Sequence, residues 1–236
     1  MFPIKDDLPS ERFAFVNLGL ILLTTGVFLW QVQLGEALEG AMMRHGVVPA
    51  AFWGALARGR ADGLGTLVTA IFLHGGWLHL LGNMWFLFVF GDNVEGRLGH
   101  ARYFFFYLAA GALAFVAQAL LETGSEVPII GASGAIAGVL GLYMVLFPDA
   151  RVRTLLLLGI FILFPKIRAW WFLGWWFVVQ AFSATVSRLE AASATGGGVA
   201  WWAHIGGFLV GLAAVRVWPD IRRRQRGLRK RPGSRG

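Results

Sequence analysis

The 236-residue chain has no cysteine and little charge, with Asp, Glu, Lys and Arg making up only 14% of its residues. The absence of cysteine excludes disulfides, thiolate metal ligands and a thiol nucleophile. Soluble domains carry about 25% charged residues, so the low charge argues against an ordinary water-soluble globule. The chain is instead rich in apolar side chains, which form 57% of it, and its mean hydropathy is +0.63. This balance also excludes an intrinsically disordered protein.

Stretches without Asp, Glu, Lys or Arg predict where the chain crosses a bilayer. They cover residues 13–34, 64–90, 103–121, 127–148, 154–165, 169–187 and 191–215. A helix needs about 20 apolar residues to cross a hydrocarbon core of about 30 Å, so residues 154–165 are too few. We expect that segment to be interfacial or re-entrant, which leaves six spans. Gly75 and Gly76 interrupt the second stretch, so its span is expected to begin near Gly76, after a loop that partly enters the membrane.

The predicted architecture is an all-α polytopic membrane protein, a bundle of six transmembrane helices with a membrane-associated first external loop. The bundle takes residues 13–218, between an N-terminal segment of residues 1–12 and a basic tail of residues 219–236. Most Lys and Arg residues fall on the side that holds both termini. The positive-inside rule therefore predicts cytoplasmic termini, and we expect the inner membrane of a bacterial cell. A basic tail is also typical of nucleic-acid binding, but after an apolar span topology explains it better, and no nucleic-acid partner is expected.

Polar side chains inside predicted spans are costly and point to function. The second span carries His79 and Asn83, which are four residues apart and share one helix face. The fourth carries Ser133 and the sixth carries His204. These three spans run in the same direction, which places the three groups within about one helical turn of the same depth. Each residue alone also has a structural explanation, such as a serine bonded to its own helix or an asparagine that joins helices.

Small residues on two of these spans predict that Ser133 and His204 come together. Ala137 and Gly141 follow Ser133 on its helix face, and glycines follow His204 in the same way. Helices with small faces approach closely. A serine is a poor nucleophile unless a base takes its proton, and a neutral histidine is the usual base. Because no predicted span contains Asp or Glu, the pattern favours a Ser–His dyad over a triad.

Acyl transfer also needs hydrogen-bond donors for the developing oxyanion. His79 and Asn83 can both donate from one face, and the amide of Ser133 can add a third donor because N–H groups of a first helical turn lack a helical acceptor. Gly131 and Gly134 allow backbone and substrate to come close, and we expect them to line the substrate cleft. The histidines lack carboxylate partners at ligand spacing, so neither a metal nor another cofactor is expected.

At these residues the sequence resembles the rhomboid family of intramembrane serine proteases, over roughly residues 64–215. The motifs are Gly-x-Ser-Gly at 131–134, His-x-x-x-Asn at 79–83 and Ala-His-x-Gly-Gly at 203–207. The resemblance implies Ser133 as nucleophile, His204 as general base, and an oxyanion hole of His79, Asn83 and the Ser133 amide. It also implies a structural role for His74.

Two further features are expected from the resemblance. Glu95 and Arg97 look like a structural pair beyond the second span. Some members carry a tyrosine one turn after the nucleophile, on which the base stacks, but here that position is Ala137. The support of the His204 ring is then expected from Trp201, Trp202 or Phe208.

The function expected is hydrolysis of a peptide bond in a transmembrane or juxtamembrane segment of another membrane protein, within the lipid bilayer. Tryptophans in residues 170–182 make the fifth span a candidate lateral gate for the substrate, with lipid anchoring as the alternative explanation. Two other functions remain open at this point. One is a non-catalytic adaptor that binds transmembrane segments in the same cleft, and the other is a small transporter with polar residues along a pore.

Overall fold

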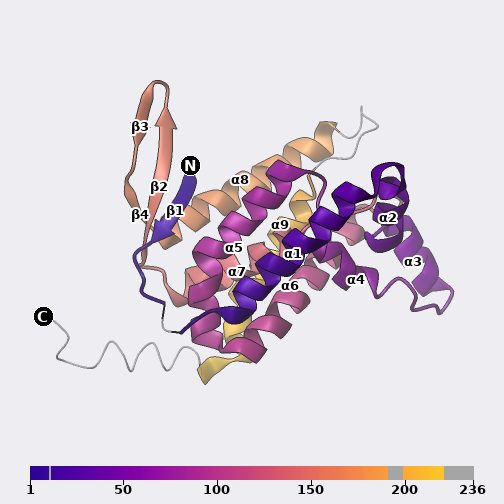
Figure 1. Ribbon diagram of the computed structural model, residues 1–236, viewed down its shortest axis with the longest axis horizontal. Helices are drawn as coiled ribbons and strands as arrows, with labels where there is room; N and C mark the ends of the chain where they lie inside the picture. The colour runs from indigo at the N-terminus through magenta and orange to yellow at the C-terminus, as the bar shows by residue number, and fades with distance from the viewer. Residues whose placement is uncertain (11, 191–198, 221–236) are drawn as a thin grey trace, which may run out of the picture.

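The structure is a computed structural model that describes residues 1–10, 12–190 and 199–220. Most of the predicted basic tail and the start of the last charge-free stretch lie outside the described residues. Within them, the long helices pack into a bundle, as Figure 1 shows. They are α1 (Phe15–Gln33), α5 (Trp77–Leu98), α6 (His100–Leu121), α7 (Ser133–Leu146), α8 (Ala169–Glu190) and α9 (Trp201–Val217).

Each of these helices overlaps one of the charge-free stretches, and the chain is mostly helical. By length and composition, α1 and α6 are apolar enough to cross a membrane, while α7 and α9 are apolar but shorter. The second span was expected to begin near Gly76, and α5 begins at Trp77. Its start follows the two glycines because Gly76 has an extended backbone that does not continue a helix.

Helix α7 is the centre of the bundle, with every residue from Gly134 to Tyr143 buried. A helix that is apolar all round is covered either by other elements or by lipid, and here the neighbouring helices cover it. Glycines allow α9 to lie directly against it: a Cβ at Gly207 would collide with the carbonyl oxygen of Gly134, and one at Gly211 with that of Gly138. The two backbones are therefore in contact along the small faces that the sequence predicted.

Helix α7 begins later than the fourth predicted span, which was expected over residues 127–148. Residues 129 and 131 lie outside the helix, and their backbone groups bond to the segment between α1 and α5. Ile129 exchanges two hydrogen bonds with Val47, of 2.8 and 3.0 Å, and the Gly131 amide donates to the Ala70 carbonyl at 2.9 Å. This pairing stops the helix at Ser133 and leaves the serine in its first turn.

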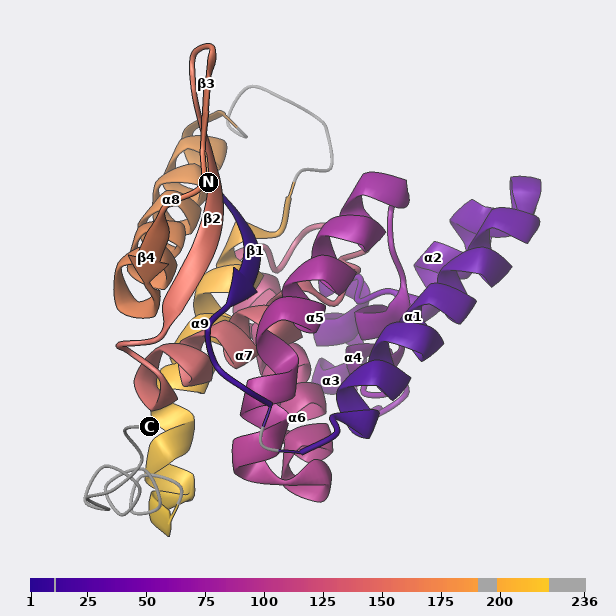
Figure 2. The ribbon, with the colours of Figure 1, turned by 60° about the vertical axis from the view of Figure 1, so that its left-hand side comes forward.

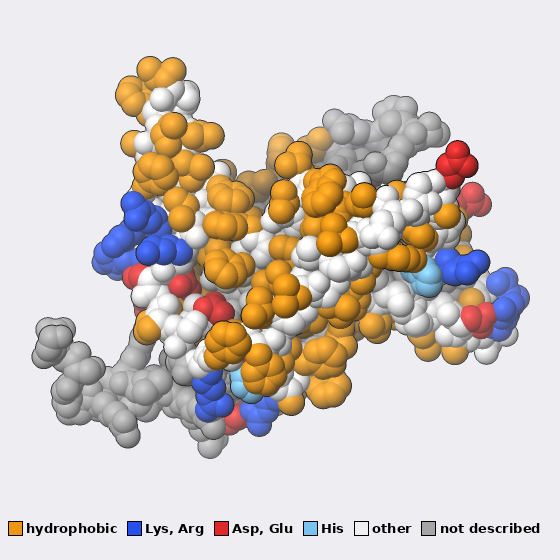
Figure 3. All heavy atoms as spheres, viewed as in Figure 1, with side chains coloured by type: hydrophobic (Ala, Val, Ile, Leu, Met, Phe, Trp, Pro, Cys, Tyr) orange, Lys and Arg blue, Asp and Glu red, His pale blue; other side chains and the backbone are white. Residues whose placement is uncertain are grey.

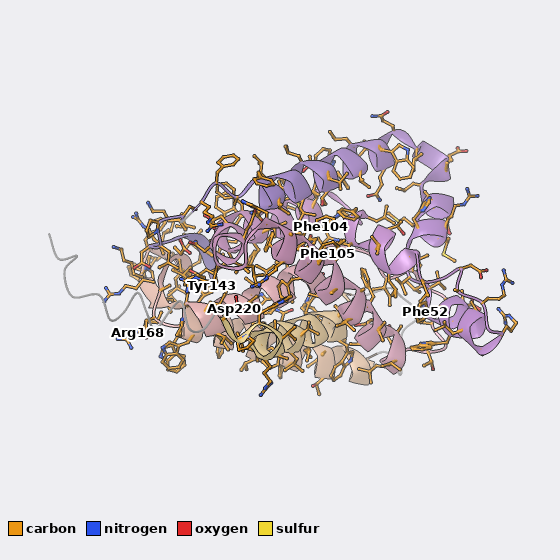
Figure 4. All side chains as sticks on the ribbon, turned by 90° about the horizontal axis from the view of Figure 1, so that it is seen from below. Phe52, Phe104, Phe105, Tyr143, Arg168 and Asp220 are labelled. Atoms are coloured by element: carbon orange, nitrogen blue, oxygen red, sulfur yellow. The ribbon has the colours of Figure 1, made fainter. Side chains whose placement is uncertain are left out.

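The segment between α1 and α5 is folded rather than irregular. It contains η1 (Gly35–Ala37), α2 (Leu38–His45), α3 (Pro49–Ala57), α4 (Thr66–Thr69) and η2 (Ala70–Phe72). Phe52 is buried, and the Trp53 indole donates to the Ala119 carbonyl at the end of α6 at 2.8 Å. This segment lies at the opposite end of the molecule from Arg168, as Figure 4 shows.

The expectation of helices alone is wrong at residues 151–168, which form strands. The strands are β1 (Phe2–Asp6), β2 (Arg151–Leu158), β3 (Phe161–Leu163) and β4 (Lys166–Arg168), and β2 pairs antiparallel with the other three. Residues 154–165, expected as an interfacial or re-entrant segment, form a hairpin that turns at Gly159 with φ +59°. A run too short to cross as a helix satisfies its backbone groups by strand pairing instead.

The hairpin projects from the bundle, as Figure 2 shows. Its far end is apolar and exposed, and its base carries basic side chains, visible in Figure 3 as orange and blue spheres. Ile160 is 91% exposed and Phe161 65%. At the base, β1 ties the N-terminal segment to the bundle, because Asp6 accepts hydrogen bonds from Tyr143 of α7 and Asn93 of α5.

Candidate active site

Ser133 and His204 meet where α7 and α9 begin. The Ser133 hydroxyl lies 2.8 Å from Nε2 of His204, although the residues are 71 positions apart in the chain. Ser133 is half-buried and is the first residue of α7, and His204 is buried in the first turn of α9. The glycine contacts between the two helices bring these starts together, because a Cβ at Gly207 would force the backbones apart.

His79 and Asn83 face Gly131, just before Ser133. A Cβ built on Gly131 would lie 2.8 Å from Cε1 and 2.9 Å from Nε2 of His79, and 3.9 Å from Nδ2 of Asn83. Gly131 also has φ +121°, a conformation that side chains disfavour. Glycine is therefore required here for two reasons, and its absent side chain leaves room directly in front of both potential donors.

The tautomer of His79 follows from its other ring nitrogen. The Gly75 amide donates to Nδ1 of His79 over 3.4 Å. An imidazole nitrogen that accepts a hydrogen bond carries no proton, so in the neutral ring the proton is on Nε2. That Nε2–H is the group beside Gly131.

His74 orients Asn83, in keeping with the structural role implied for it. The Asn83 amide nitrogen lies 2.9 Å from Nε2 of His74, and Nδ1 of His74 lies 3.3 Å from the Phe72 carbonyl. Gln31 of α1 holds the backbone of His74 through both its amide oxygen and its amide nitrogen, at 3.0 and 3.1 Å. The Nδ2 group of Asn83 is thus fixed, with one N–H on His74 and a second N–H still available as a donor.

Gln180 is a site residue that the sequence analysis missed. Its Oε1 lies 2.7 Å from Nδ1 of His204, and the side chain is buried on α8. An uncharged amide in a predicted span is costly unless it has a partner, and that cost was the available signal. Gln31 and Gln118 follow the same rule, since Gln118 accepts a hydrogen bond from the Ala203 amide at 3.1 Å.

Aromatic rings also surround His204. Trp201 lies edge-on to the imidazole, with ring centres 5.8 Å apart, and Trp176 of α8 lies at 6.1 Å. Phe208, which was expected to support the ring, packs on Trp176 and Phe177 instead. Of the expected supports, Trp201 contacts His204, and the remaining support comes from α8.

Two expectations need correction. Gly134 was expected in the substrate cleft, but a Cβ there would lie 2.6 Å from the Ala114 side chain and 3.6 Å from the Ala203 carbonyl, so it faces the packing of α6 and α9. Glu95 and Arg97 were expected to pair. The Glu95 carboxylate instead accepts the first-turn amides of α1, the nearer at 2.7 Å, while Arg97 lies 5.0 Å from the centre of the Phe147 ring. The first contact caps α1 and the second holds the end of α7.

The arrangement has the parts that an acyl transfer requires. It combines the half-buried Ser133 hydroxyl with the His204 imidazole as its hydrogen-bond acceptor. His79 and Asn83, beside Gly131, are two further potential hydrogen-bond donors. In the described part of the chain, no three His, Asp or Glu side chains group closely enough to hold a metal ion.

Comparison with known proteins gives the class of this protein. A family model described as the rhomboid domain matches residues 61–219. The chain belongs to the rhomboid family, and with its apolar helices it is a membrane protein.

Individual relatives agree with this assignment. The rhomboid protein YdcA of Bacillus subtilis (strain 168) is 41% identical over 88 residues, which cover 36% of this chain and 44% of that protein. Rhomboid-like protein 11, chloroplastic, of Arabidopsis thaliana is 31% identical over 154 residues, 64% of this chain and 50% of its own length. RHOMBOID-like protein 5 of the same plant is 37% identical over 75 residues, 32% of this chain and 24% of its own length. The chain thus spans half or less of the length of each of these relatives.

Proposed function

We propose that this protein is an intramembrane serine endopeptidase that cleaves transmembrane or juxtamembrane segments of other membrane proteins. The observation that carries the proposal is the 2.8 Å contact between the Ser133 hydroxyl and Nε2 of His204. A hydroxyl that donates to an unprotonated imidazole is the arrangement that activates serine as a nucleophile. Membership of the rhomboid family supports the same conclusion.

The reaction follows from the contacts of each group. His204 takes the hydroxyl proton of Ser133 as Oγ attacks the carbonyl carbon of the scissile bond. The oxyanion accepts hydrogen bonds from His79 Nε2–H, the free N–H of Asn83 and the Ser133 amide, each of which is worth about 10²–10³ in rate in comparable sites. His204 then gives the proton to the leaving amine, and the C–N bond breaks. Water, deprotonated by His204, hydrolyses the acyl-enzyme and restores Ser133.

The proposal includes six membrane spans within residues 13–218, with both termini in the cytoplasm of a bacterial cell. It is supported by the length and composition of α1 and α6 and by the excess of basic residues on one side. Helix α7 has 14 residues, about 21 Å, which is shorter than the hydrocarbon core. Ser133 at its first residue therefore lies below the external surface, at the depth of a substrate's membrane segment.

The substrate is proposed to be a helix that unwinds locally before cleavage. A helix keeps its carbonyls in hydrogen bonds, so residues that weaken helices, such as Gly and Pro, should mark good substrates. The resemblance to rhomboids implies a small residue before the cut. Helix α8 is the proposed gate: Trp170, Trp171 and Trp175 are exposed on its surface, while Trp176 packs toward His204.

Active-site labelling tests this function directly. A fluorophosphonate reacts only with an activated serine, so the purified wild type should be labelled and Ser133→Ala should not. Ser187→Ala, which removes an exposed serine from α8, is the matched control and should label like the wild type.

Cleavage of a model transmembrane substrate should follow the same pattern as labelling. Full cleavage by Ser133→Ala would end the serine mechanism. Binding of the substrate without label or cleavage in the wild type would identify a non-catalytic adaptor, and solute flux in liposomes without label would identify a transporter.

A further inference from the structure

The buried amide of Gln180 is the one polar side chain, among the described residues, that contacts the ring nitrogen of His204 opposite Ser133. Its Oε1 lies 2.7 Å from Nδ1, and Ser133 Oγ lies 2.8 Å from Nε2, so the ring is held from both sides. The three residues come from three helices, α8, α9 and α7. Both Gln180 and His204 are less than 10% exposed, at 7% and 8%, which shields the contact from competing water.

We propose that Gln180 is a positioning residue for the general base. A neutral imidazole has one N–H donor and one acceptor nitrogen. A carbonyl oxygen at Nδ1 requires the proton to be there, which leaves the lone pair of Nε2 for the Ser133 proton. Without that oxygen, part of the population would carry its proton on Nε2 and could not act as base. This inference rests on the proposed peptidase function.

The contacts of α8, that of Gln180 among them, take the place of two supports that a catalytic histidine can have, a carboxylate at Nδ1 and a stacked ring one turn after the serine. In the described part of the chain, the hydrogen-bond partner of Nδ1 is the Gln180 amide and not a carboxylate, and Ala137 provides no ring on which the imidazole could stack. Helix α8 replaces both, because it supplies the acceptor from Gln180 and an aromatic neighbour from Trp176 at 6.1 Å. The orientation of the base therefore depends on the position of α8 relative to α9.

The backbone near His204 is held separately. Gln118 of α6 accepts a hydrogen bond from the Ala203 amide, in the first turn of α9, at 3.1 Å. That contact fixes the start of the helix, whereas the Gln180 contact fixes the ring. Loss of Gln180 should therefore change the state of the imidazole while leaving the helix in place.

The kinetic test compares Gln180→Met with Gln180→Glu. Methionine has a similar length but no amide acceptor, and it should lower kcat about tenfold to a hundredfold while leaving KM unchanged, the size of effect seen for residues that orient metal-bound histidines. Glutamate keeps an acceptor oxygen at the same reach and should restore most of kcat. Thr185→Val, which removes an exposed hydroxyl from α8, should behave as the wild type. Wild-type kcat in Gln180→Met would overturn the proposal.

A second measurement does not depend on activity. In full-length protein with Ser133→Ala, ¹⁵N NMR of His204 should show the proton on Nδ1, and Gln180→Met in that background should give a mixture of tautomers. A proton on Nε2 with Gln180 present would overturn the proposal even if cleavage is normal. Conversely, if the wild type gives no label that depends on Ser133, the peptidase function fails, while the NMR result still reports on the contact. Gln180→Leu serves if the methionine variant does not fold.

Discussion

At the scale of single residues, Gly131 has the most constrained place in the site. Its φ of +121° and its contact with His79 both exclude a side chain. Gly131→Ala should therefore displace the His79 ring and lower kcat on the order of 10²-fold, the effect of losing one oxyanion donor. The measurement is cleavage of a model transmembrane substrate by the variant.

Gly82 provides the matched control for this substitution. It lies on α5 next to Asn83, and a Cβ there meets nothing within 4 Å. Gly82→Ala should keep the wild-type rate, because it adds a methyl group at a helical position with open space. An equal loss in both variants would mean that α5, rather than the space before His79, is the sensitive feature.

The surroundings of Ser133 and His204 differ in exposure to solvent. His204 is buried, whereas Ser133 is half-buried and thus open to a substrate. The donors opposite them are fixed by neighbours outside the motif residues, since Gly75 sets the tautomer of His79 and His74 orients Asn83. The chemistry proposed for the site depends on these supporting contacts as much as on the motif residues.

At the scale of elements, the pairing of α7 with α9 decides whether the site exists. A Cβ at Gly211 would collide with the Gly138 carbonyl and would lie 2.7 Å from the Leu142 amide. Gly211→Ala should therefore lower the free energy of unfolding by about 1–3 kcal/mol, the usual result of overpacking, and should reduce cleavage as the helices separate. Thermal unfolding in detergent measures the first effect.

A glycine on another helix serves as the control for Gly211. Gly174 lies on α8, and a Cβ there meets nothing within 4 Å. Gly174→Ala should be neutral or slightly stabilising, because alanine is the better helix former. If the free energy of unfolding falls equally in both variants, the loss would come from helix propensity and not from the contact of α7 with α9.

At the scale of the whole molecule, strand β1 connects the N-terminal segment to elements far along the chain. It pairs with β2, and its Pro3 carbonyl accepts a hydrogen bond from the Trp85 indole of α5. Asp6 reaches Tyr143, on the same helix as Ser133, and Figure 4 shows Tyr143 within the bundle. The N-terminal strand thus joins α5 and α7, and its contact on α7 lies toward the end of that helix opposite Ser133.

The docking of β1 should depend on pH through Asp6. Burial raises the pKa of Asp6 from 3.8 to about 6, against a smaller lowering by the Tyr143 hydrogen bond, and the carboxylates of Asp92 and Asp7 raise it further. A raised pKa in the docked state means that docking is favoured at low pH and weakens as the pH rises from about 4 through 6. Hydrogen exchange of the β1 amides, corrected for intrinsic rates, should show more protection at pH 5 than at pH 7.5.

Asp6→Asn is the control for this prediction, because the amide keeps an acceptor oxygen for Tyr143 without a titrating proton. Its β1 protection should not change between the two pH values. The role given to Asp6 would be contradicted if β1 in the wild type were equally protected at the two pH values, or more protected at pH 7.5.

The sequence by itself determined the mostly helical character of the chain, its family and the residues that could do chemistry. Uncharged stretches and the polar residues within them are local properties of the sequence. Because burying a polar group is costly, such residues can be recognised as functional candidates from the sequence alone. The fourth stretch shows the limit of this reasoning. Its helix begins only at Ser133, because residues 129 and 131 bond to a loop more than 50 positions earlier.

Only the tertiary structure decided which groups face one another. At residues 151–168, β2 pairs with the nearby strands β3 and β4, but it also pairs with β1, at the far end of the chain, and no local pattern contains that partner. Gln180 stands 24 residues from His204, and nothing in the spacing shows that their side chains meet. Gly134 looked like a cleft residue by its place in the motif, yet α6 and α9 cover it. The rotation of each helix about its axis sets such contacts, and that rotation comes from packing among all the helices at once.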